Sequence, residues 1–243
     1  MPRPNRIKEA IREERKAHGF CLTLPSASVV EILGKLDFDF VFIDGEHGCF
    51  GLALLEEVCR TAELVGITPI ARVPDISEGT IGRYLDRGVR GIIGPHISTR
   101  EDAERLVRAS YFGAIGERSC GSSRGNNYGI GIDDWSAHMT QSNETIIVGA
   151  MIEDQAGVDN LDDIMAVPHI DYLMIGPQDF AQGAGYPGQP RHPEVRKRMD
   201  AVHDRVRAAG HQVREDILNF AWDRELLMAG AQGVLDSWSA AAR

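Results

Sequence analysis

Short apolar runs alternate with amphipathic stretches along almost the whole chain, and this alternation constrains the fold more than any other feature. The runs read as buried strands, while the stretches between them place apolar residues three and four positions apart, as helices do. Strands that alternate with helices pair in parallel, because each helix returns the chain to the edge where strands start. The predicted strands are residues 19–24, 38–43, 68–73, 91–94, 145–152, 172–175, 211–215 and 233–235, and the predicted helices are residues 29–35, 52–64, 78–87, 100–110, 157–166, 194–209 and 222–229.

Eight strands in 243 residues predict an α/β fold of the closed (β/α)8 TIM barrel type rather than an open sheet. No linker or internal repeat interrupts the pattern, so residues 1–243 are predicted to form a single domain. Residues 113–142 are the exception, because they are rich in Gly, Ser and Asn and long for a connection. With Arg118 and Arg124, this segment is either an anion-contacting flap or a solvated loop.

The net charge of −10 argues against two classes of partner. A nucleic-acid-binding protein needs a basic face, and so does a protein that docks on anionic lipid. The longest apolar runs are too short to span a membrane, and the amino-terminal residues alternate in charge without the hydrophobic stretch of a signal peptide. We therefore expect a cytoplasmic protein with no nucleic-acid or membrane partner.

Two acidic residues stand just past the ends of apolar strands: Glu153 follows the fifth predicted strand and Asp179 lies beyond the sixth. A carboxylate at the exit of a buried strand is poorly solvated unless something pairs with it. Two of them, from successive strands, indicate a divalent cation. Oxygen ligands favour Mg²⁺, Mn²⁺ or Co²⁺ over structural zinc. The alternative is that each carboxylate caps the helix that follows it.

Other polar residues follow strands at the same predicted edge, where barrel enzymes place their catalytic groups. Arg72 ends an apolar strand, so its guanidinium needs an anion. That anion is either a substrate carboxylate or developing oxyanion, or a structural partner, Asp44 or Glu46. These two acids are interpreted as strand-exit groups that pair with backbone amides. His47 is a candidate general acid or base, and His96 follows the fourth strand.

Asp86 is predicted at the carboxyl end of a helix, where a free carboxylate opposes the helix dipole. This placement indicates either a specific partner, such as a histidine, or an exposed and weakly destabilising residue.

Six stretches together carry a family resemblance, and they span most of the chain. They are Phe-Asp-Phe-Val-Phe-Ile-Asp-Gly-Glu-His-Gly at 38–48, Ala-Arg-Val-Pro at 71–74, Tyr-Leu-Asp-Arg-Gly at 84–88, Ile-Glu at 152–153, Ile-Gly-Pro-Gln-Asp at 175–179 and Gly-Tyr-Pro-Gly-Gln-Pro-Arg-His-Pro-Glu-Val at 185–195. In this combination and order, the chain resembles the HpcH/HpaI aldolase family, the class II pyruvate-dependent aldolases.

The resemblance implies a (β/α)8 barrel of the phosphoenolpyruvate/pyruvate-binding type. It also implies a divalent metal ion (Mg²⁺, Mn²⁺ or Co²⁺) on Glu153 and Asp179. Pyruvate would chelate the ion through its carboxylate and keto oxygens, and the backbone amides of Gln178 and Asp179 would also hold the carboxylate. The ion would act as a Lewis acid that lowers the free energy of the enolate.

The resemblance also implies the catalytic groups. Arg72 would stabilise the enolate oxygen, and His47, oriented by Asp86, would move protons at the aldol hydroxyl. The implied reaction is the reversible cleavage of a 4-hydroxy-2-oxo acid to pyruvate and an aldehyde by a carbon–carbon lyase, of the kind used in aromatic or sugar-acid catabolism. The runner-up is an oxaloacetate decarboxylase, or another enolate-forming lyase or synthase, on the same barrel. A different class is a non-catalytic protein that senses a 2-oxo acid.

The chain departs from the family pattern in several places. Met151 stands where many members have Gln. Residues Arg214, Glu215 and Asp216 replace small apolar residues of the seventh strand and would point into the barrel mouth. The tail stops at Arg243, soon after the last predicted strand. The final helix, which members commonly exchange across a dimer within a hexamer, is therefore expected to be short or absent. A homo-oligomer, either a hexamer or a smaller assembly, is still implied.

Overall fold

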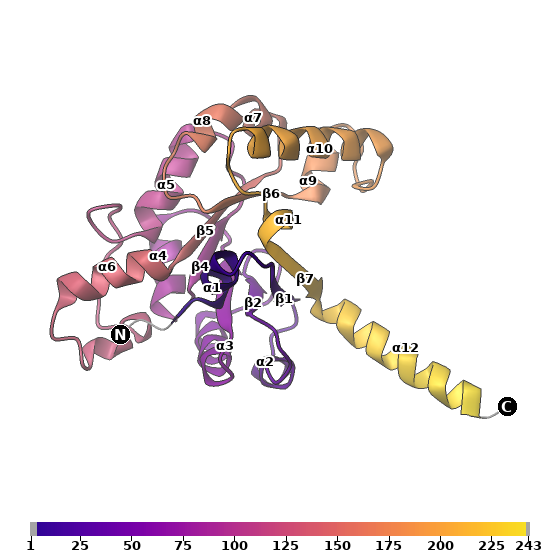
Figure 1. Ribbon diagram of the computed structural model, residues 1–243, viewed down its shortest axis with the longest axis horizontal. Coiled ribbons are helices and arrows are strands. Elements are labelled where there is room, and N and C mark those ends of the chain that lie inside the picture. Colours follow the sequence, from indigo (N-terminus) through magenta and orange to yellow (C-terminus); the bar gives the residue numbers. More distant parts are fainter. Residues whose placement is uncertain (1–3, 242–243) are drawn as a thin grey trace.

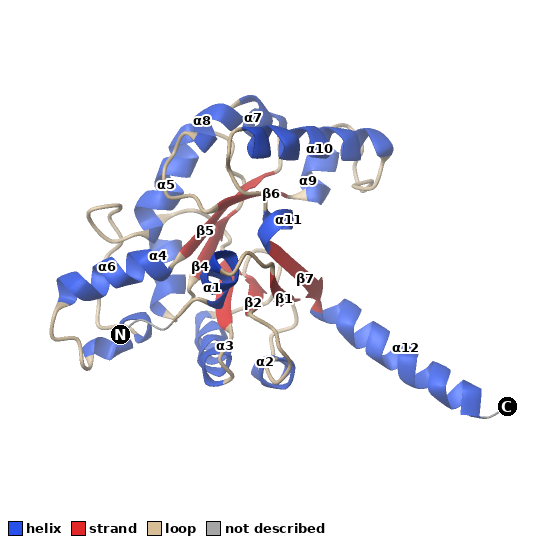
Figure 2. Ribbon diagram, in the orientation of Figure 1, coloured by secondary structure: helices blue, strands red, loops and turns tan. Residues whose placement is uncertain are grey.

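A single parallel sheet forms the centre of the computed structural model, which describes residues 4–241. Its seven strands lie in the order β6-β5-β4-β3-β2-β1-β7. Figure 2 shows them at the centre of the molecule, with helices around them. The sheet therefore follows the chain order from β1 to β6, and β7 pairs with β1. The strands are β1 (Ala17–Leu22), β2 (Phe40–Asp44), β3 (Thr68–Arg72), β4 (Gly91–Gly94), β5 (Ile147–Ile152), β6 (Tyr172–Ile175) and β7 (Leu218–Trp222).

Helices return the chain from the carboxyl end of one strand to the amino end of the next, so the parallel α/β class is confirmed (Figure 1). The helices are α1 (Arg6–Arg12), α2 (Ala27–Leu33), α3 (Leu52–Leu64), α4 (Glu78–Asp86), α5 (Arg100–Ser110), the 3-10 helix η1 (Arg124–Gly129), α6 (Trp135–Thr145), α7 (Gln155–Asp159), α8 (Leu161–Met165), α9 (Pro177–Gly183), α10 (Pro193–Ala208), α11 (Arg214–Ile217) and α12 (Asp223–Ala241).

The sheet curls, and the two sides of its strands bury two separate groups of apolar residues. One group fills the inside of the curl and includes Phe40, Phe42, Ile70 and Tyr172. The other lies between the strands and the surrounding helices. Because both faces are covered, the strands from β2 to β6 read as continuous apolar runs, and β1 does so from Gly19 onward. The first six predicted strands are therefore confirmed to within two residues.

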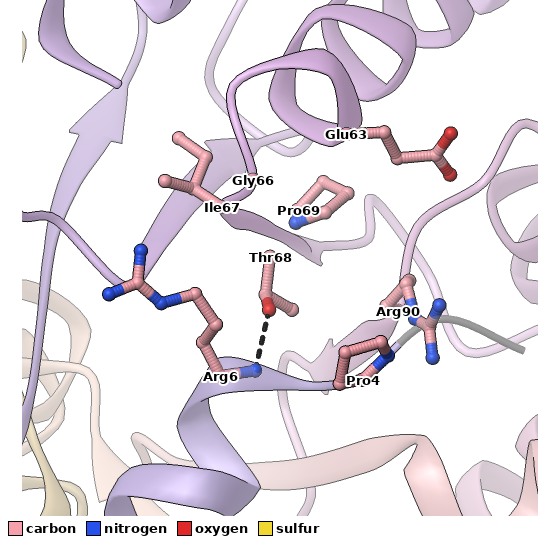
Figure 3. A pocket seen from close by; sticks show the side chains of 8 residues that line it. All are labelled: Pro4, Arg6, Glu63, Gly66, Ile67, Thr68, Pro69 and Arg90. Atoms are coloured by element: carbon pink, nitrogen blue, oxygen red, sulfur yellow. Dashed lines mark hydrogen bonds between the residues drawn. The ribbon is translucent and has the colours of Figure 1, made fainter. Parts of the chain in front are cut away.

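The amino-terminal helix closes the inside of the curl at the end where the strands begin. Ile7 and Ala10 of α1 are fully buried against the inner group of apolar residues. Asn5, which caps this helix, donates from its side-chain amide to the carbonyl oxygens of Arg90 (3.1 Å) and Thr145 (2.8 Å). The backbone amide of Arg6 donates to Thr68 Oγ1, with 2.9 Å between nitrogen and oxygen, beside a small pocket (Figure 3). None of the residues lining that pocket is a predicted site residue.

The predicted seventh strand, residues 211–215, is reduced to a single bridge between Val213 and Leu173. The helix α11 begins at Arg214, so the strand stops after one paired residue. Lys16, which precedes β1, donates to the carbonyl oxygen of Glu215, and Asp216 pairs with Arg207 of α10. The expectation that residues 214–216 point into the barrel mouth is therefore wrong for Glu215 and Asp216, which lie at the amino-terminal end of the sheet. The guanidinium of Arg214 lies 5.0 Å from the ring centroid of Phe220, a residue packed against the inner apolar group.

The predicted eighth strand, residues 233–235, is also wrong, because it lies inside α12. The strand that pairs with β1 on the side away from β2 is β7, formed by Leu218–Trp222. The final helix is not short: α12 has 19 residues and extends away from the rest of the chain (Figure 1). No helix among residues 4–241 is both long enough and apolar enough to cross a membrane.

The segment 113–142 is partly helical, because η1 and most of α6 fall within it. Arg124 forms an ion pair with Glu63, at the end of α3, and donates to the carbonyl oxygen of Arg87. The guanidinium of Arg118 lies over the ring of Phe112, 4.3 Å from its centroid. Both arginines are thus engaged within the fold, and Arg124 binds the ends of helices that return to the amino-terminal side of the sheet. This arrangement does not support an anion-contacting flap.

Candidate functional site

The most buried ion pair at the carboxyl ends of the strands joins β2 to β3. Asp44 and Arg72 are register partners at the last positions of these strands. Arg72 donates from Nε to Asp44 Oδ1 (3.1 Å) and from Nη2 to Asp44 Oδ2 (2.8 Å). This two-point pairing fixes the plane of the guanidinium. The structural partner predicted for Arg72 is therefore present, and it leaves Nη1 turned toward the rest of the site.

Two further side chains meet that remaining nitrogen. Arg72 Nη1 is 3.0 Å from Glu46 Oε2 and 4.0 Å from Met151 Sδ. Burial opposes the charge on Arg72, but Asp44, Glu46 and Glu153 outweigh it and raise the pKa of the guanidinium. Arg72 is thus a fixed cation. Met151, the apolar departure from the family pattern, provides only a weak sulfur acceptor where an amide side chain would bond more strongly.

Asp44 also holds the turn that follows β2. Its Oδ1 accepts from the backbone amides of Glu46 (3.3 Å) and His47 (3.2 Å), as expected for a strand-exit carboxylate. The His47 ring is 64% exposed, and its Nε2 lies 3.8 Å from Glu46 Oε2. The turn therefore presents an accessible imidazole beside the Arg72 cluster.

Glu153 is a buried carboxylate immediately after β5, with 3% of its surface exposed. Its Oε1 accepts from the backbone amide of His96 at 2.8 Å. Burial raises the pKa of Glu153, the contacts with His96 lower it, and the negative charges of Glu46 and Asp179 raise it again, so that the net direction is upward. A buried carboxylate close to two others is stabilised by a cation.

Asp179 reaches the same region from the first turn of α9, where it is half-buried. Among residues 4–241, no group of three or more His, Cys, Asp or Glu side chains is already arranged to hold a metal ion. The donor set nevertheless fits a hard divalent cation that keeps several waters, since Glu153 and Asp179 are oxygen donors that lie within electrostatic range of each other. The capping alternative finds no support at Asp179, because α9 has no side-chain cap at its amino end.

His96 is the residue whose importance sequence reasoning missed. It follows β4 with a backbone φ of 52°, and its ring meets two carboxylates: Nε2 is 3.1 Å from Glu46 Oε1 and Nδ1 is 3.2 Å from Glu153 Oε1. His96 thereby links the Arg72 cluster to Glu153. The available signal was its place directly after a strand, which it shares with the other site residues.

Asp86 is not brought to His47 within one chain. It ends α4, on the side where β4 begins, whereas His47 follows the carboxyl end of β2. The partner of Asp86 is Ser123, whose hydroxyl donates to Oδ1 at 2.8 Å. The orientation of His47 by Asp86 remains a prediction. Gln178, in contrast, lies beside Asp179 in the first turn of α9, where amide hydrogens have no acceptor within the helix.

The fold and this site define a parallel α/β enzyme with an acidic and cationic cluster at the strand exits, the edge where such enzymes carry their chemistry. The family model described as HpcH/HpaI aldolase/citrate lyase matches residues 18–234. The chain belongs to this family, in which its curated relatives are carbon–carbon lyases. A 5-keto-4-deoxy-D-glucarate aldolase from Shigella boydii is 31% identical over 208 residues, which cover 85% of this chain and 79% of that protein.

Solved structures agree with the family assignment. A HpcH/HpaI aldolase/citrate lyase family protein from Burkholderia cenocepacia J2315 superposes with a TM-score of 0.87 at 27% identity, covering 97% of this chain and 99% of the other. The citrate synthase SbnG gives a TM-score of 0.83 at 29% identity, covering 97% and 98%. The similarity therefore extends over nearly the whole chain, and it includes proteins with different reactions.

Proposed function

We propose that this chain is a divalent-metal-dependent class II aldolase that reversibly cleaves a 4-hydroxy-2-oxo acid to pyruvate and an aldehyde. One observation carries the proposal: the buried Glu153 lies within electrostatic range of Asp179 and Arg72 at a single edge of the sheet. The carboxylates of this cluster outnumber its one guanidinium, so a cation is needed to balance them, and a divalent ion bound there would in turn attract an anionic substrate. The substrate class follows the 31% identical aldolase, whose name describes a keto acid.

Glu153 and Asp179 would hold the ion, which when bound supplies Lewis-acid stabilisation to the enolate of pyruvate. The amides of Gln178 and Asp179 would hold the substrate carboxylate, as amides at the start of a helix suit an anion. Arg72 would donate from Nη1 to the oxygen on C2 as negative charge develops there. Since Asp44 already fixes the guanidinium, little reorganisation accompanies this step.

His47 is proposed to move the proton of the aldol hydroxyl. In the cleavage direction its imidazole accepts the proton from the C4 hydroxyl, the C3–C4 bond breaks, and the enolate of pyruvate and the aldehyde separate. The accessibility of the ring suits this role, because 64% of the side chain is exposed and the leaving aldehyde must exit to solvent. Imidazole is the side chain that most often serves as a general acid or base in enzymes.

A second candidate is a synthase or decarboxylase that uses the same enolate, such as an oxaloacetate decarboxylase. The likeness to a citrate synthase at 29% identity supports it. Arg72, Glu153 and Asp179 would serve both reactions. The two functions differ in what leaves C3, which is an aldehyde in one case and carbon dioxide in the other.

The test is the exchange of pyruvate methyl protons in D₂O, followed by NMR. Protein with Mg²⁺, Mn²⁺ or Co²⁺ is expected to remove the methyl signal, and EDTA is expected to stop the loss. Glu153→Ala and Asp179→Ala should each abolish exchange, whereas Glu57→Ala, an exposed acid on α3, should not. Absence of exchange with all three ions would contradict the proposal, and near wild-type turnover in either ligand variant would contradict that ligand.

We also infer that the fold is an eight-stranded (β/α)8 barrel in which the seventh strand is reduced to Val213. The support is the bridge from Val213 to Leu173 of β6, together with α11, which occupies the connection between Val213 and β7. Amide hydrogen exchange tests this proposal. The amide of Leu173, which donates to the carbonyl oxygen of Gln212, should be protected to the same degree as amides inside β5.

A homo-oligomer is proposed as the active form. The exposed apolar side chains of α12 support it, because their spacing puts them on one face of the helix and monomers rarely expose such a surface. These residues are Leu227, Met228, Val234, Leu235 and Trp238. A second copy of the chain is the expected partner.

A further inference from the structure

His96 is held at three points, although 59% of its side chain is exposed. Its backbone amide donates to Glu153 Oε1 at 2.8 Å, its Nδ1 lies 3.2 Å from the same oxygen, and its Nε2 lies 3.1 Å from Glu46 Oε1. The backbone φ of 52° belongs to the left-handed region, which a residue other than glycine adopts at a cost. A strained backbone that aims a ring between two carboxylates points to a functional role.

The ring nitrogens have different chemistry in this position. A carboxylate only accepts hydrogen bonds, so the contact with Glu46 requires a hydrogen on Nε2. The other ring nitrogen, Nδ1, faces Glu153 Oε1 and is the one placed to offer a lone pair to a metal ion. Two acceptors 3.2 Å apart repel each other unless a proton or a metal cation lies between them.

The spacing suits a shared metal ion. Neighbouring ligands of an octahedral ion, each about 2.1 Å from it, are about 3.0 Å apart, close to the 3.2 Å between Nδ1 and Oε1. Histidines that bind metals usually donate from the other ring nitrogen to a carboxylate, which fixes the ring. Glu46 occupies that second position, and Arg72 in turn holds Glu46 at 3.0 Å.

We propose that His96 is a third protein ligand of the divalent ion, binding through Nδ1 beside Glu153 and Asp179. This inference rests on the proposed function for the ion itself. The half-buried Asp179 side chain would rotate toward the other two when the ion binds. An imidazole ligand shifts preference from Mg²⁺ toward Mn²⁺ and Co²⁺, so the chain should prefer these ions.

Pulsed electron paramagnetic resonance of the tag-free protein with Mn²⁺ tests the proposal directly, because a bound imidazole gives a ¹⁴N coupling to the ion. The coupling is expected in the wild type and not in His96→Asn. Asparagine suits this variant because it tolerates a positive φ. The matched control is His211→Ala, since His211 precedes Val213 at the opposite end of the sheet, and it should keep the coupling. The Mn²⁺ dissociation constant of His96→Asn should rise about 10- to 100-fold, and that for Mg²⁺ should rise less.

The outcomes separate this inference from the proposed function. Mn²⁺ that binds through Glu153 without a ¹⁴N coupling would show that His96 is a protonated bridge between two carboxylates, and would overturn the inference alone. A coupling that persists in His96→Asn would also overturn it. Failure of the wild type to bind Mn²⁺, or equal binding by Glu153→Ala, would overturn both.

Discussion

The carboxylate of Glu153 fills the space that a side chain at Gly176 would occupy. A Cβ atom added at Gly176 would collide with Glu153 Oε2, and it would lie 3.0 Å from the Cβ of Glu153. The φ of Gly176 is −81°, so the requirement for glycine here is one of space and not of backbone conformation. The turn between β6 and α9 therefore sets where this carboxylate sits.

Gly176→Ala is expected to displace the Glu153 carboxylate and to weaken Mn²⁺ binding at least 10-fold, as the loss of a ligand's support does. The matched control is Gly183→Ala in the same helix, where an added Cβ meets only Asp154 Cα at 4.0 Å. Titration calorimetry measures both. Equal affinity in the two variants would show that Glu153 does not hold the ion.

Arg72→Lys is expected to lower the rate of pyruvate exchange about 100-fold, the usual effect of removing one donor to a developing oxyanion. Lysine keeps the charge but cannot pair with both oxygens of Asp44, so the variant should also unfold at a lower temperature. Arg60→Lys, on the exposed face of α3, serves as the control. Exchange within threefold of the wild type would remove Arg72 from the mechanism.

His47→Ala is expected to reduce aldol cleavage by at least 100-fold, because general base catalysis contributes that much, and to reduce oxaloacetate decarboxylation much less. Decarboxylation has no aldol hydroxyl to deprotonate. Coupled assays that detect pyruvate from both substrates provide the comparison, with the exposed His18→Ala as the control. Equal losses in both reactions would rule out the proton-transfer role.

Asp39→Asn is expected to lower the free energy of unfolding by about 2–3 kcal/mol at pH 7. Asp39 is 2% exposed and pairs with Arg15 at 2.7 Å and with Arg6 at 3.1 Å. Burial acts to raise its pKa, but the hydrogen bonds from Arg15 and the His18 amide outweigh burial, so the pKa falls below its ordinary value of 3.8. Urea denaturation measures the difference from the wild type, with the exposed Asp37→Asn as the control.

The lowered pKa of Asp39 also fixes the sign of the pH dependence. The folded state binds the proton more weakly than the unfolded state, so the stabilisation is complete above pH 3.8 and is lost as the pH falls through the folded value. The difference between wild type and Asp39→Asn should therefore be constant above about pH 5 and shrink below pH 4. A difference that grows on acidification would contradict this assignment.

Trp238→Arg is expected to reduce the size of the assembly measured by light scattering. Trp238 is 67% exposed and lies on the apolar face of α12. Ala240→Arg, which is exposed and on the opposite face by helical spacing, should leave the assembly unchanged. If both variants and the wild type are monomeric, α12 does not bind a second copy.

The sequence predicted the first six strands because all of them, apart from the exposed His18 of β1, are buried on both faces and therefore read as nearly continuous apolar runs. β7 broke that rule: Asn219 is exposed and Phe220, Ala221 and Trp222 are half-buried, so the segment lacks a distinct strand pattern. The apolar residues at 233–235 resembled a strand because they are consecutive. In the structure they belong to α12, a helix whose apolar face is exposed. A short run of apolar residues looks the same in the sequence whether it forms a buried strand or part of such a helix.

The candidate site was predictable where residue type and strand position agreed. Arg72 and Glu153 were found because a charge after an apolar strand needs a partner, and both lie in one cluster. The link through His96 was not predictable, because it depends on a positive φ that turns the ring between two carboxylates from different strands. The partner of Asp86 depends on how the segment 113–142 folds back, and its irregular sequence gave no pattern for that.

The cap of α1 has a consequence for the order of folding during synthesis. The side chain of Asn5 bonds to carbonyl groups that lie 85 and 140 residues later in the chain. On the ribosome, α1 is made first but must wait until the start of β5 has emerged before its last anchor exists. The base of the sheet is therefore sealed late, by a segment translated before all of its strands, and until then the apolar group that Ile7 and Ala10 cover is incomplete.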